Sequence, residues 1–288
     1  MRKIEQYHLH KAHPEKLQFE AYPLAAYRQD NSEKAVVPHS HSYYQIIWFI
    51  KGEGVHYVDF DTYPIEDNTI IFISKDQIHA FDEKLTNEGW LIHFNESFFM
   101  QAEIDIFLKH NIFNSSLNPS YVIDHDTANT ASTYIDLIQK ELSNRQTFGF
   151  ETVLRFLLKS LLIKLTRIHQ KSPQKKLKLN SAYELQLYKF NELIETYFAK
   201  GLTIRAYADL LNISTKTLAT ITKKIVKKSP SQILCERIIL EAKRLIKFTP
   251  LQIGEIAFRL GFEDDSYFIK YFKKQVGQSP LHYRKNVS

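Results

Sequence analysis

The spacing of apolar residues changes near the middle of the chain. Before residue 100, short aromatic and β-branched runs are separated by glycine, proline and asparagine; these runs are Tyr43–Ile50, Val55–Phe60, Thr69–Ile73 and Trp90–Phe94. Runs of this length and composition are typical of strands in a small antiparallel sandwich or barrel. From about residue 130, apolar positions recur every three to four residues, which predicts helices. The pattern therefore predicts an α+β fold.

Two helices are predicted directly after the strands, over Thr130–Leu142 and Phe150–His169. In the second helix, apolar residues alternate at spacings of four and three and form a short a/d seam of Leu154, Leu158, Leu161, Leu165 and Ile168. Such a helix can lie wholly within its own domain, or it can pack on the sheet with one side and on a partner with another. We therefore expect residues 126–170 to form a packing or dimerisation segment.

A polar and basic stretch separates these helices from the rest of the chain. It spans residues 171–181 and contains Pro173, which is the composition of a linker. A chain of 288 residues is long enough for two domains of usual size. We expect a sheet-rich domain over residues 1–125, the helical segment over 126–170, the linker over 171–181 and a second, all-helical domain over 182–288.

Charge is distributed unevenly between the two parts. Residues 1–174 carry 17 Lys and Arg against 22 Asp and Glu, whereas residues 175–288 carry 21 against 10. An acidic part joined to a strongly basic part is typical of a sensing or assembly domain attached to a nucleic-acid-binding domain. The chain contains one cysteine, Cys235, which excludes a disulfide framework and a cysteine-rich zinc module.

The segment Ile253–Tyr283 has the pattern of two short helices joined by a tight turn. Apolar residues on one helix face come first, and Gly261 then occupies a position where helix ends favour a left-handed residue. Asp264 and Asp265 are candidate N-caps of the second helix, whose inner positions are Phe268, Tyr271 and Phe272. Because the outer face of that helix carries lysines, the pattern predicts a helix-turn-helix that reads a DNA major groove.

The sequence of this segment resembles the signature of the AraC/XylS transcription regulators. The matching positions are Ile253, Ile256, Ala257, Gly261, Phe262, Asp264, Ser266, Tyr267, Phe268, Phe272, Lys273, Lys274, Gly277, Ser279, Pro280, Tyr283 and Arg284. A match of this length is specific. The resemblance implies a transcription regulator whose C-terminal domain contains two helix-turn-helix motifs.

A second, weaker copy of the motif covers Thr203–Lys224. Asn212 stands in place of the turn glycine, and asparagine tolerates the left-handed region. This copy departs from the family pattern at two positions, since Thr222 replaces a usual phenylalanine and Lys227 a usual glycine. The second departure suggests a looser turn. A helix over Ser231–Phe248 connects the copies and spans roughly 27 Å, so the resemblance implies one chain that reads two adjacent major grooves.

The outward positions of the two second helices are the candidate DNA contacts. In the first copy they are Lys216, Thr217, Thr220, Lys223 and Lys224, and in the second Asp265, Ser266, Ile269, Lys270, Lys273 and Lys274. Lysines at the helix ends are expected to bind phosphates, whereas Ser266 and Lys270 are the best candidates for base edges. Asp265 could instead be an N-cap. Neither face contains an arginine, so we expect moderate sequence specificity.

Histidines lie beside and within the predicted strands. The segment Pro38–Gly54 resembles the first cupin motif, with His39, His41 and Gln45 at its spacing, and Asn68–His79 resembles the second motif, with His79. The resemblance predicts a cupin-like β-barrel with flanking helices. Residues that share the inner face would form a pocket for a small-molecule effector, and the candidates are His39, His41, Tyr43, Gln45, His79 and His93.

A metal site at His39, His41, Gln45 and His79 is the alternative interpretation of the same residues. Metal-binding cupins use three histidines and a glutamate, and here Gln45 removes the carboxylate. We therefore expect no metal and no cofactor, and we interpret the histidines as the lining of an effector pocket.

The sequence thus predicts a DNA-binding transcriptional regulator and not an enzyme. We expect it to bind double-stranded DNA as a homodimer and to be controlled by a small-molecule effector. If it is an activator, it is also expected to contact RNA polymerase. Without an apolar leader or membrane-length run it is expected to be cytoplasmic, with no membrane partner. Two alternatives stay open: a ligand-independent regulator whose cupin domain only dimerises, and a metal-dependent cupin enzyme with a DNA-binding tail.

Overall fold

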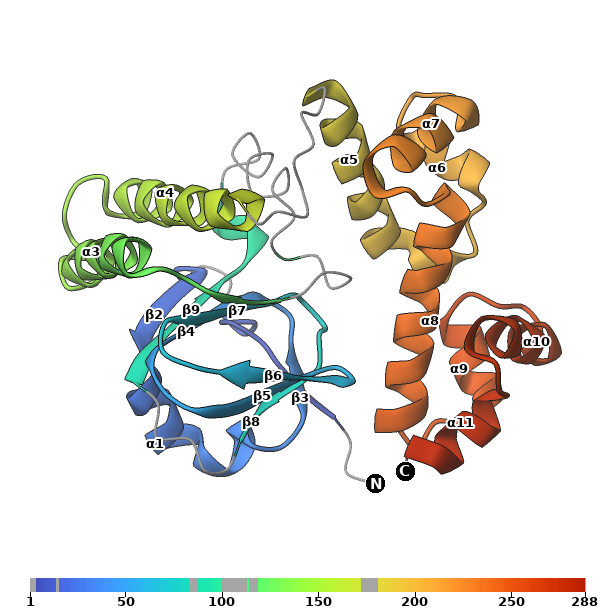
Figure 1. Cartoon of the computed structure of the whole chain (residues 1–288), viewed down its shortest axis with the longest axis horizontal. Helices are drawn as coiled ribbons and strands as arrows, with labels where there is room; N and C mark the ends of the chain where they lie inside the picture. The colour runs from blue at the N-terminus through green and yellow to red at the C-terminus, as the bar shows by residue number, and fades with distance from the viewer. Residues whose placement is uncertain are drawn as a thin grey trace. The chain divides into compact units, whose positions relative to one another are not determined.

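The computed structural model describes residues 4–13, 16–82, 88–99, 113, 119–171 and 181–287 (Figure 1). They form two compact units, one over Glu5–Lys176 and a second that contains Leu177–Ser288. The first is rich in strands and the second is helical, which confirms the predicted α+β class. The predicted linker, 171–181, lies outside the described residues except for Lys171 and Ser181. None of the described helices has the length and apolar character needed to cross a bilayer.

Two five-stranded sheets make up the first unit, in the orders β1-β3-β8-β5-β6 and β10-β7-β4-β9-β2. The strands are β1 Glu5–Tyr7, β2 Phe19–Pro23, β3 His39–His41, β4 Tyr44–Lys51, β5 Gly54–Val58, β6 Asp61–Ile65, β7 Thr69–Ile73, β8 His79–Phe81, β9 Glu88–Phe94 and β10 Ser120–Val122. The four predicted runs correspond to β4, β5, β7 and β9. Helix α1, Leu24–Ala35, and the short helix η1, Glu96–Phe98, complete this part.

The central strand β4 is buried on both faces, and its side chains alternate between two cores. Ile46 and Trp48 pack in the core beneath the helices, whereas Ile47 and Phe49 pack in the core between the two sheets. A strand with both faces covered needs apolar residues at successive positions. This explains why Tyr44–Lys51 is an almost continuous apolar run rather than an alternating one.

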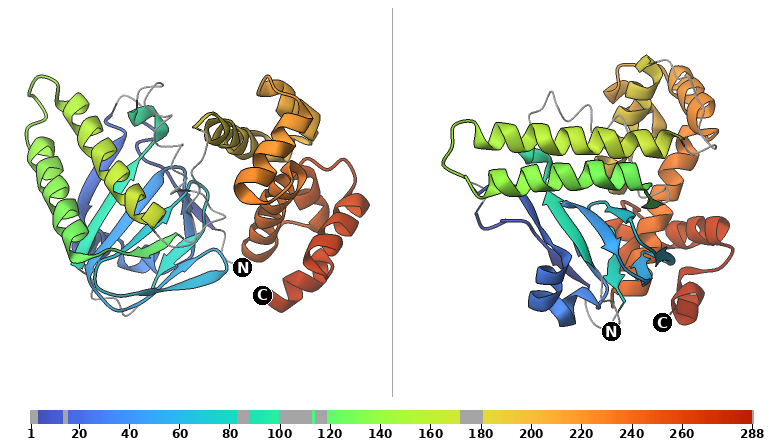
Figure 2. Two further views of the ribbon diagram at one scale, coloured as in Figure 1. Left: turned by 45° about the horizontal axis from the view of Figure 1, so that its top comes forward. Right: turned by 60° about the vertical axis from the view of Figure 1, so that its left-hand side comes forward.

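Helices α3, His125–Leu142, and α4, Phe150–Lys171, lie side by side across the second sheet (Figure 2). The side chain of Asp124 caps α3 by accepting a hydrogen bond from the backbone N–H of Thr127 at 2.8 Å. The four described seam residues, Leu154, Leu158, Leu161 and Leu165, are buried in the core between these helices and the sheet. The seam therefore packs within its own unit; the side chain of Ile168 lies outside the described part.

The second unit contains two helix-turn-helix motifs joined by a long helix (Figure 1). Its helices are α5 Ser181–Tyr197, η2 Phe198–Lys200, α6 Ile204–Leu210, α7 Thr215–Val226, α8 Pro230–Phe248, α9 Ile253–Arg259, α10 Asp265–Val276 and α11 Pro280–Val287. A capping box between Ser229 and Gln232 begins α8, with Pro230 in its first turn. With 19 residues, α8 is about 28 Å long.

A buried arginine ties this helix to the first motif. Arg237 on α8 is 7% exposed; its Nε donates to Glu195 of α5 at 2.8 Å, and its Nη1 donates to Glu241 at 2.9 Å. Its guanidinium also lies over the ring of Phe198, 4.0 Å from the centroid. Because Phe198 packs against the cores of both motifs, this network fixes α8 relative to the elements before it.

Candidate functional sites: two recognition helices and a buried histidine cluster

Each helix of the first motif begins at a capped residue. The hydroxyl of Thr203 accepts from the N–H of Ala206 at 3.2 Å, and that of Ser214 accepts from the N–H of Thr217 at 3.0 Å. Between the helices, Asn212 has φ 54°, in the left-handed region that allows the sharp turn. The first motif therefore keeps the turn geometry despite lacking a glycine there, as expected.

The second motif repeats this plan with glycine in the turn. Gly261 has φ 81°, and a Cβ at this position would lie 2.5 Å from the carbonyl oxygen of Ala199 in η2. Only glycine permits both this backbone conformation and this close approach. The turn of the second motif thus packs directly on the segment that precedes the first motif.

Asp264 is the N-cap of α10, since its carboxylate accepts from the N–H of Ser266 at 2.8 Å. Asp265 is the first residue of the helix, and its side chain is exposed. The alternative interpretation of Asp265 as the N-cap is therefore wrong, and its carboxylate lies at the N-terminal end of the recognition helix.

The helices α7 and α10 have the same length, 12 residues, and both end at a left-handed residue. Lys227, with φ 59°, ends α7, and Gly277, with φ 83°, ends α10. Lys227 thus adopts the conformation that glycine adopts in the second copy, and the backbone N–H of Gly277 donates to the carbonyl of Lys273 at 2.9 Å. A looser turn at Lys227 stays a prediction.

The cores of the two motifs exchange large and small side chains. In the first motif Tyr207 and Thr222 are fully buried, and at the equivalent positions of the second Ile256 and Phe272 are fully buried. The first copy therefore buries its aromatic side chain on its first helix, and the second copy buries Phe272 on its second helix, where the first copy has Thr222.

The eleven candidate DNA contacts all lie on α7 and α10. Nine are exposed, and Thr217 and Ile269 are half-buried. Three of those on α7 are engaged locally. The hydroxyl of Thr217 shares a hydrogen bond with that of Ser214 at 2.8 Å, Thr220 donates to the carbonyl of Lys216 at 2.9 Å, and Lys224 Nζ lies 5.2 Å from the ring centroid of Tyr183. The two threonines can still accept hydrogen bonds from base edges.

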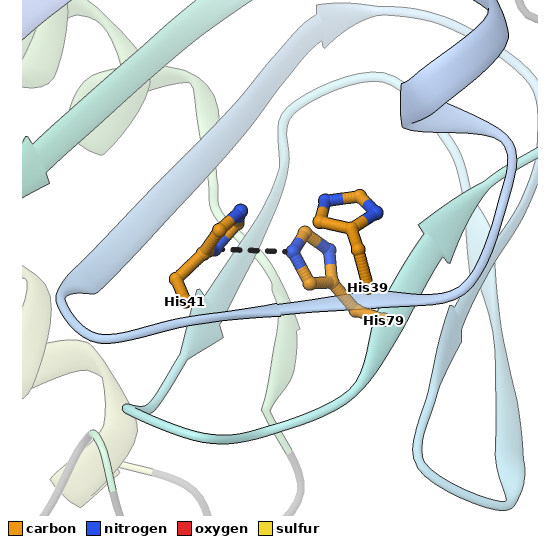
Figure 3. A group of neighbouring side chains, drawn as sticks. All are labelled: His39, His41 and His79. Atoms are coloured by element: carbon orange, nitrogen blue, oxygen red, sulfur yellow. Dashed lines mark hydrogen bonds between the residues drawn. The ribbon is translucent and has the colours of Figure 1, made fainter. Parts of the chain in front are cut away.

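The second candidate site is a buried group of histidines between the sheets. His39 and His41 on β3 and His79 on β8 point toward one another (Figure 3). Their ring centroids are 4.4 to 4.9 Å apart, and each residue is 1% exposed. Strand pairing explains this convergence, because His39 lies directly opposite His79 across the β3–β8 ladder.

A fourth histidine, His56 on β5, joins this group. His56 Nε2 lies 3.1 Å from His79 Nδ1, and His79 Nε2 lies 3.3 Å from His41 Nδ1. His56 was not among the expected pocket residues. The period of two in the predicted strand Val55–Phe60 places His56 and Val58 on one face and Tyr57 on the other, and this is the signal that could have assigned His56 to the inner face; in the structure His56 and Val58 are buried and Tyr57 is exposed.

The other candidates surround the four histidines. Tyr43 stacks on His41 with 4.5 Å between centroids. Gln45 and His93 face each other in the β4–β9 ladder of the opposite sheet, and His93 Nδ1 lies 2.9 Å from the hydroxyl of Tyr22. All six candidate pocket residues are therefore buried within the first unit, and Tyr22 is a further neighbour that the sequence did not indicate.

Several polar atoms of the cluster have no hydrogen-bond partner in the described part of the chain. They are Nε2 of His39, Nε2 of His41, Nδ1 of His56 and both amide atoms of Gln45. A buried polar atom without a partner costs about 1–3 kcal/mol. Such atoms in a native interior indicate that something else satisfies them.

Burial keeps these imidazoles neutral. It lowers the pKa of His56 and of His93 to about 3, and that of His39 below its usual value. Burial, and next the neighbouring histidines, lower the pKa values of His41 and His79 well below the usual range. The interior of the unit is thus polar but uncharged at neutral pH.

A neutral imidazole is also the form that binds metal ions. Among the described residues, ring nitrogens of His39, His41 and His79 lie within 4.8 Å of one another. His39 Nδ1 donates to the carbonyl of Val37 at 2.8 Å, which leaves its Nε2 lone pair free for a ligand. The three histidines therefore offer donors that fit a transition-metal ion, whereas Gln45, which lies opposite His93 in the β4–β9 ladder, is neutral where the cupin motif has a carboxylate.

Comparison with known proteins gives two matching family models. The AraC-like ligand binding domain matches residues 22–128, and a helix-turn-helix domain matches residues 207–286. The HTH-type transcriptional activator RhaS of Escherichia coli strain K12 is 23% identical over 249 residues, which cover 86% of this chain and 87% of RhaS.

Two solved structures are also similar. The C-terminal domain of the response regulator yesN from Fusobacterium nucleatum aligns with 36% of this chain and 99% of its own, at 32% identity and a TM-score of 0.33. ToxT from Vibrio cholerae aligns with 94% of this chain and 98% of its own, at 14% identity and a TM-score of 0.41. The two family models occupy separate units in the order ligand-binding domain, then helix-turn-helix domain. The chain is therefore a member of the AraC family of DNA-binding transcriptional regulators.

Proposed function

We propose that this regulator reads two adjacent major grooves of a DNA operator with α7 and α10, and that an effector bound among the histidines of the first unit controls this reading. The observation that carries the proposal is the pairing of two capped recognition helices on one unit. Arg237 and the contact of Gly261 with Ala199 join the two motifs into a single body. A fixed pair of recognition helices requires a fixed spacing of half-sites, which adds specificity that single lysines cannot supply.

Contacts to DNA divide by position along each helix. Lys223 on α7, and Lys273 and Lys274 on α10, lie exposed in the last turns and are assigned to phosphates. Ser266 and Lys270 on α10, and Lys216, Thr217 and Thr220 on α7, are assigned to base edges, with Ile269 against a thymine methyl and Asp265 against cytosine. Lys224 contributes to the positive potential of the same face.

The first unit is assigned a binding role rather than a catalytic one. Its partnerless buried atoms support a ligand inside the sheets, and such a ligand would shift the population of DNA-competent molecules if it binds that state more tightly. A regulator of this type acts in the cytoplasm, and the activator name of RhaS supports activation through RNA polymerase.

Dimerisation is assigned to the outer face of α4. Val153 is 40% exposed and Phe156 is 53% exposed, although the seam residues of the same helix are buried. Apolar side chains on an otherwise polar surface are typical of a protein interface. This face is the observation that favours the ligand-independent alternative, in which the first unit only assembles the dimer.

Selection of duplexes from a random library with the full chain, followed by affinity measurement, tests the DNA assignment. We expect the selected duplex to bind on the order of 10³ times more tightly than a scrambled duplex of equal length and composition at the same salt concentration. Equal affinity for the two duplexes would contradict sequence-specific regulation.

A further inference from the structure

We propose that the first unit has a second ligand site, between its second sheet and the helices α3 and α4, for a small uncharged molecule that is mostly apolar and carries one hydrogen-bond acceptor. This site goes beyond the proposed function, because it lies outside both the histidine cluster and the contacts assigned to DNA. A cavity, the residues that line it and a buried N–H group without a partner indicate it.

The cavity has a volume of about 10 Å³ and lies between three strands and the two helices. Strand pairing builds its sheet side, since Trp48 of β4 lies opposite both Ile70 of β7 and Trp90 of β9. Each helix contributes two residues that are four positions apart and therefore share a face. The lining residues are Ile46, Trp48, Ile70, Trp90, Ile92, Ala131, Ile135, Leu161 and Leu165.

Trp48 provides the hydrogen-bond donor of this site. The residue is 4% exposed, and its indole Nε1 has no hydrogen-bond partner among the described residues. An indole nitrogen can only donate, so the partner that it lacks is an acceptor. The other lining side chains cannot supply one, because they are aliphatic except for Trp90, which is also only a donor.

The composition of the lining favours an organic molecule over water or an ion. A buried water makes about three hydrogen bonds, whereas the indoles are the only polar side-chain groups among the lining residues that the structure describes. Apolar cavities stay dry and can bind apolar molecules. None of the described lining residues is charged, so an ion would lose its hydration without compensation. The occupant is therefore neutral, with its acceptor directed at Trp48 Nε1.

The size of the cavity requires the helices to move when a ligand binds. A volume of about 10 Å³ is the room of a single water molecule, so even a five-membered ring must separate α3 and α4 from the sheet. The strands are held together by ladder pairing, whereas the lining helices meet them through apolar side chains. Because α4 also carries Val153 and Phe156, occupancy would displace the face assigned to dimerisation.

Alternation along β4 separates this site from the histidine cluster. Ile46 and Trp48 belong to the core beneath the helices, whereas Ile47 and Phe49 belong to the core between the sheets. By the same period of two, Gln45 lies on the face of Ile47. The two sites therefore share strands but not side chains, and each can be changed without the other.

Tetrahydrofuran and cyclopentane are matched probes of this site, because both are five-membered rings and only the ether has an acceptor. Both tryptophans of the chain line the cavity, so their emission reports occupancy within the full chain. We expect each probe to shift this emission saturably, with half-saturation on the order of 1 mM, an affinity that five non-hydrogen atoms can supply. A shift that only grows linearly with concentration would overturn the proposal.

Variants of α3 test the position of the site. Ala131→Val fills the cavity and should weaken the binding of both probes by roughly tenfold or more. Ala128→Val is the matched control, because Ala128 is buried in the same core one turn earlier but does not line the cavity, and it should leave both affinities unchanged. Equal losses for the two variants would contradict the site.

Trp48→Phe tests the donor and leaves Trp90 as the reporter. Removal of the N–H should lower the affinity for tetrahydrofuran relative to that for cyclopentane by roughly 3- to 10-fold, the contribution of one neutral hydrogen bond. The ratio is measured within one protein, so it cancels any change in cavity volume and decides the proposal even if Ala131→Val does not fold. An unchanged ratio would show that Trp48 Nε1 does not contact the ligand, and the proposed class of ligand would be wrong.

Discussion

Single residues in left-handed conformations set the geometry of both DNA-reading motifs. Asn212 and Lys227 in the first copy adopt the same backbone region as Gly261 and Gly277 in the second. A side chain in this region is strained by about 1 kcal/mol, so the first copy tolerates a cost that the second avoids. The packing of the motif therefore imposes the left-handed backbone conformation. The type of residue at the position determines only how strained that conformation is.

Gly261→Ala and Gly277→Ala separate the two reasons for a glycine. Both positions have positive φ, but a Cβ at Gly277 meets nothing within 4 Å, whereas one at Gly261 lies 2.5 Å from Ala199 O. We expect Gly277→Ala to lower the free energy of unfolding by about 1 kcal/mol and Gly261→Ala by roughly 3 kcal/mol, because the clash adds to the strain. Denaturant unfolding followed by circular dichroism measures both. Equal losses would show that close approach to η2 is unimportant.

Lys270 and Lys273 test the division between base and phosphate contacts, since both are exposed on α10 three residues apart. Lys270→Ala is expected to cost about 1–3 kcal/mol on the selected duplex and little on a scrambled one. Lys273→Ala should weaken both duplexes alike and reduce the slope of log affinity against log salt by about one. Titrations at several salt concentrations measure these effects. The assignment fails if Lys270→Ala leaves the ratio of the two affinities unchanged.

At the scale of elements, the pattern of apolar and polar residues predicted the helices and strands whose formation depends on residues close in sequence. Runs such as Thr69–Ile73 and the helix Phe150–Lys171 follow from composition and period, and they appear close to their predicted limits. The short strands β1, β3 and β8 could not be predicted from composition and period, because a three-residue strand is defined by pairing with strands far along the chain. The β3–β8 pairing, 40 residues apart at His39 and His79, is an example.

The same reason limited the prediction of the histidine cluster. His39, His41 and His79 belong to motif-like segments, so their convergence could be expected from the resemblance. His56 lies in a strand whose neighbour, β8, is known only from the sheet order. Its hydrogen bond to His79 therefore depends on tertiary structure. The seam on α4 illustrates the converse, since its spacing is the same for a core inside one unit and for an interface between two chains.

The outer face of α4 gives a prediction for this element. Val153→Asp and Phe156→Asp place charges on the proposed dimer interface, where burial of an unpaired charge is costly. We expect sedimentation velocity to show a weaker dimer for both variants. Tyr57→Asp is the control, because Tyr57 is 43% exposed on β5, in the sheet that does not pack against α4. If all three variants remain dimeric at the same concentration, another surface forms the interface.

At the scale of the whole molecule, histidines and net charge are divided between the two units. Eleven of the 12 histidines precede residue 170, and the remaining one, His282, is exposed on α11. The second unit carries the positive charge and the contacts assigned to DNA, whereas the first carries a neutral polar interior. The units should therefore respond to different conditions, the first to pH and ligand and the second to salt.

The stability of the first unit should fall as the pH falls from 7 to 5 in EDTA. His56 and His93 have pKa values of about 3 in the folded unit, against about 6.5 in an unfolded chain, so unfolding takes up protons in this range. Each group then lowers the free energy of unfolding by on the order of 1 kcal/mol per pH unit below 6.5, and the loss continues toward pH 3. Both tryptophans, Trp48 and Trp90, lie in the first unit, so their fluorescence reports its unfolding within the full chain.

His93→Phe removes one of these groups and should make the pH dependence shallower by about one proton, while adding little strain in an aromatic environment. The unfolding of the second unit can be followed by the helical signal that changes independently of tryptophan fluorescence. The free energy of unfolding of this unit should vary much less between pH 7 and pH 5. A tryptophan transition that stays constant over this range would mean that the buried histidines are already protonated in the fold. The neutral interior described above would then be wrong, and with it the imidazole lone pairs that a metal ion requires.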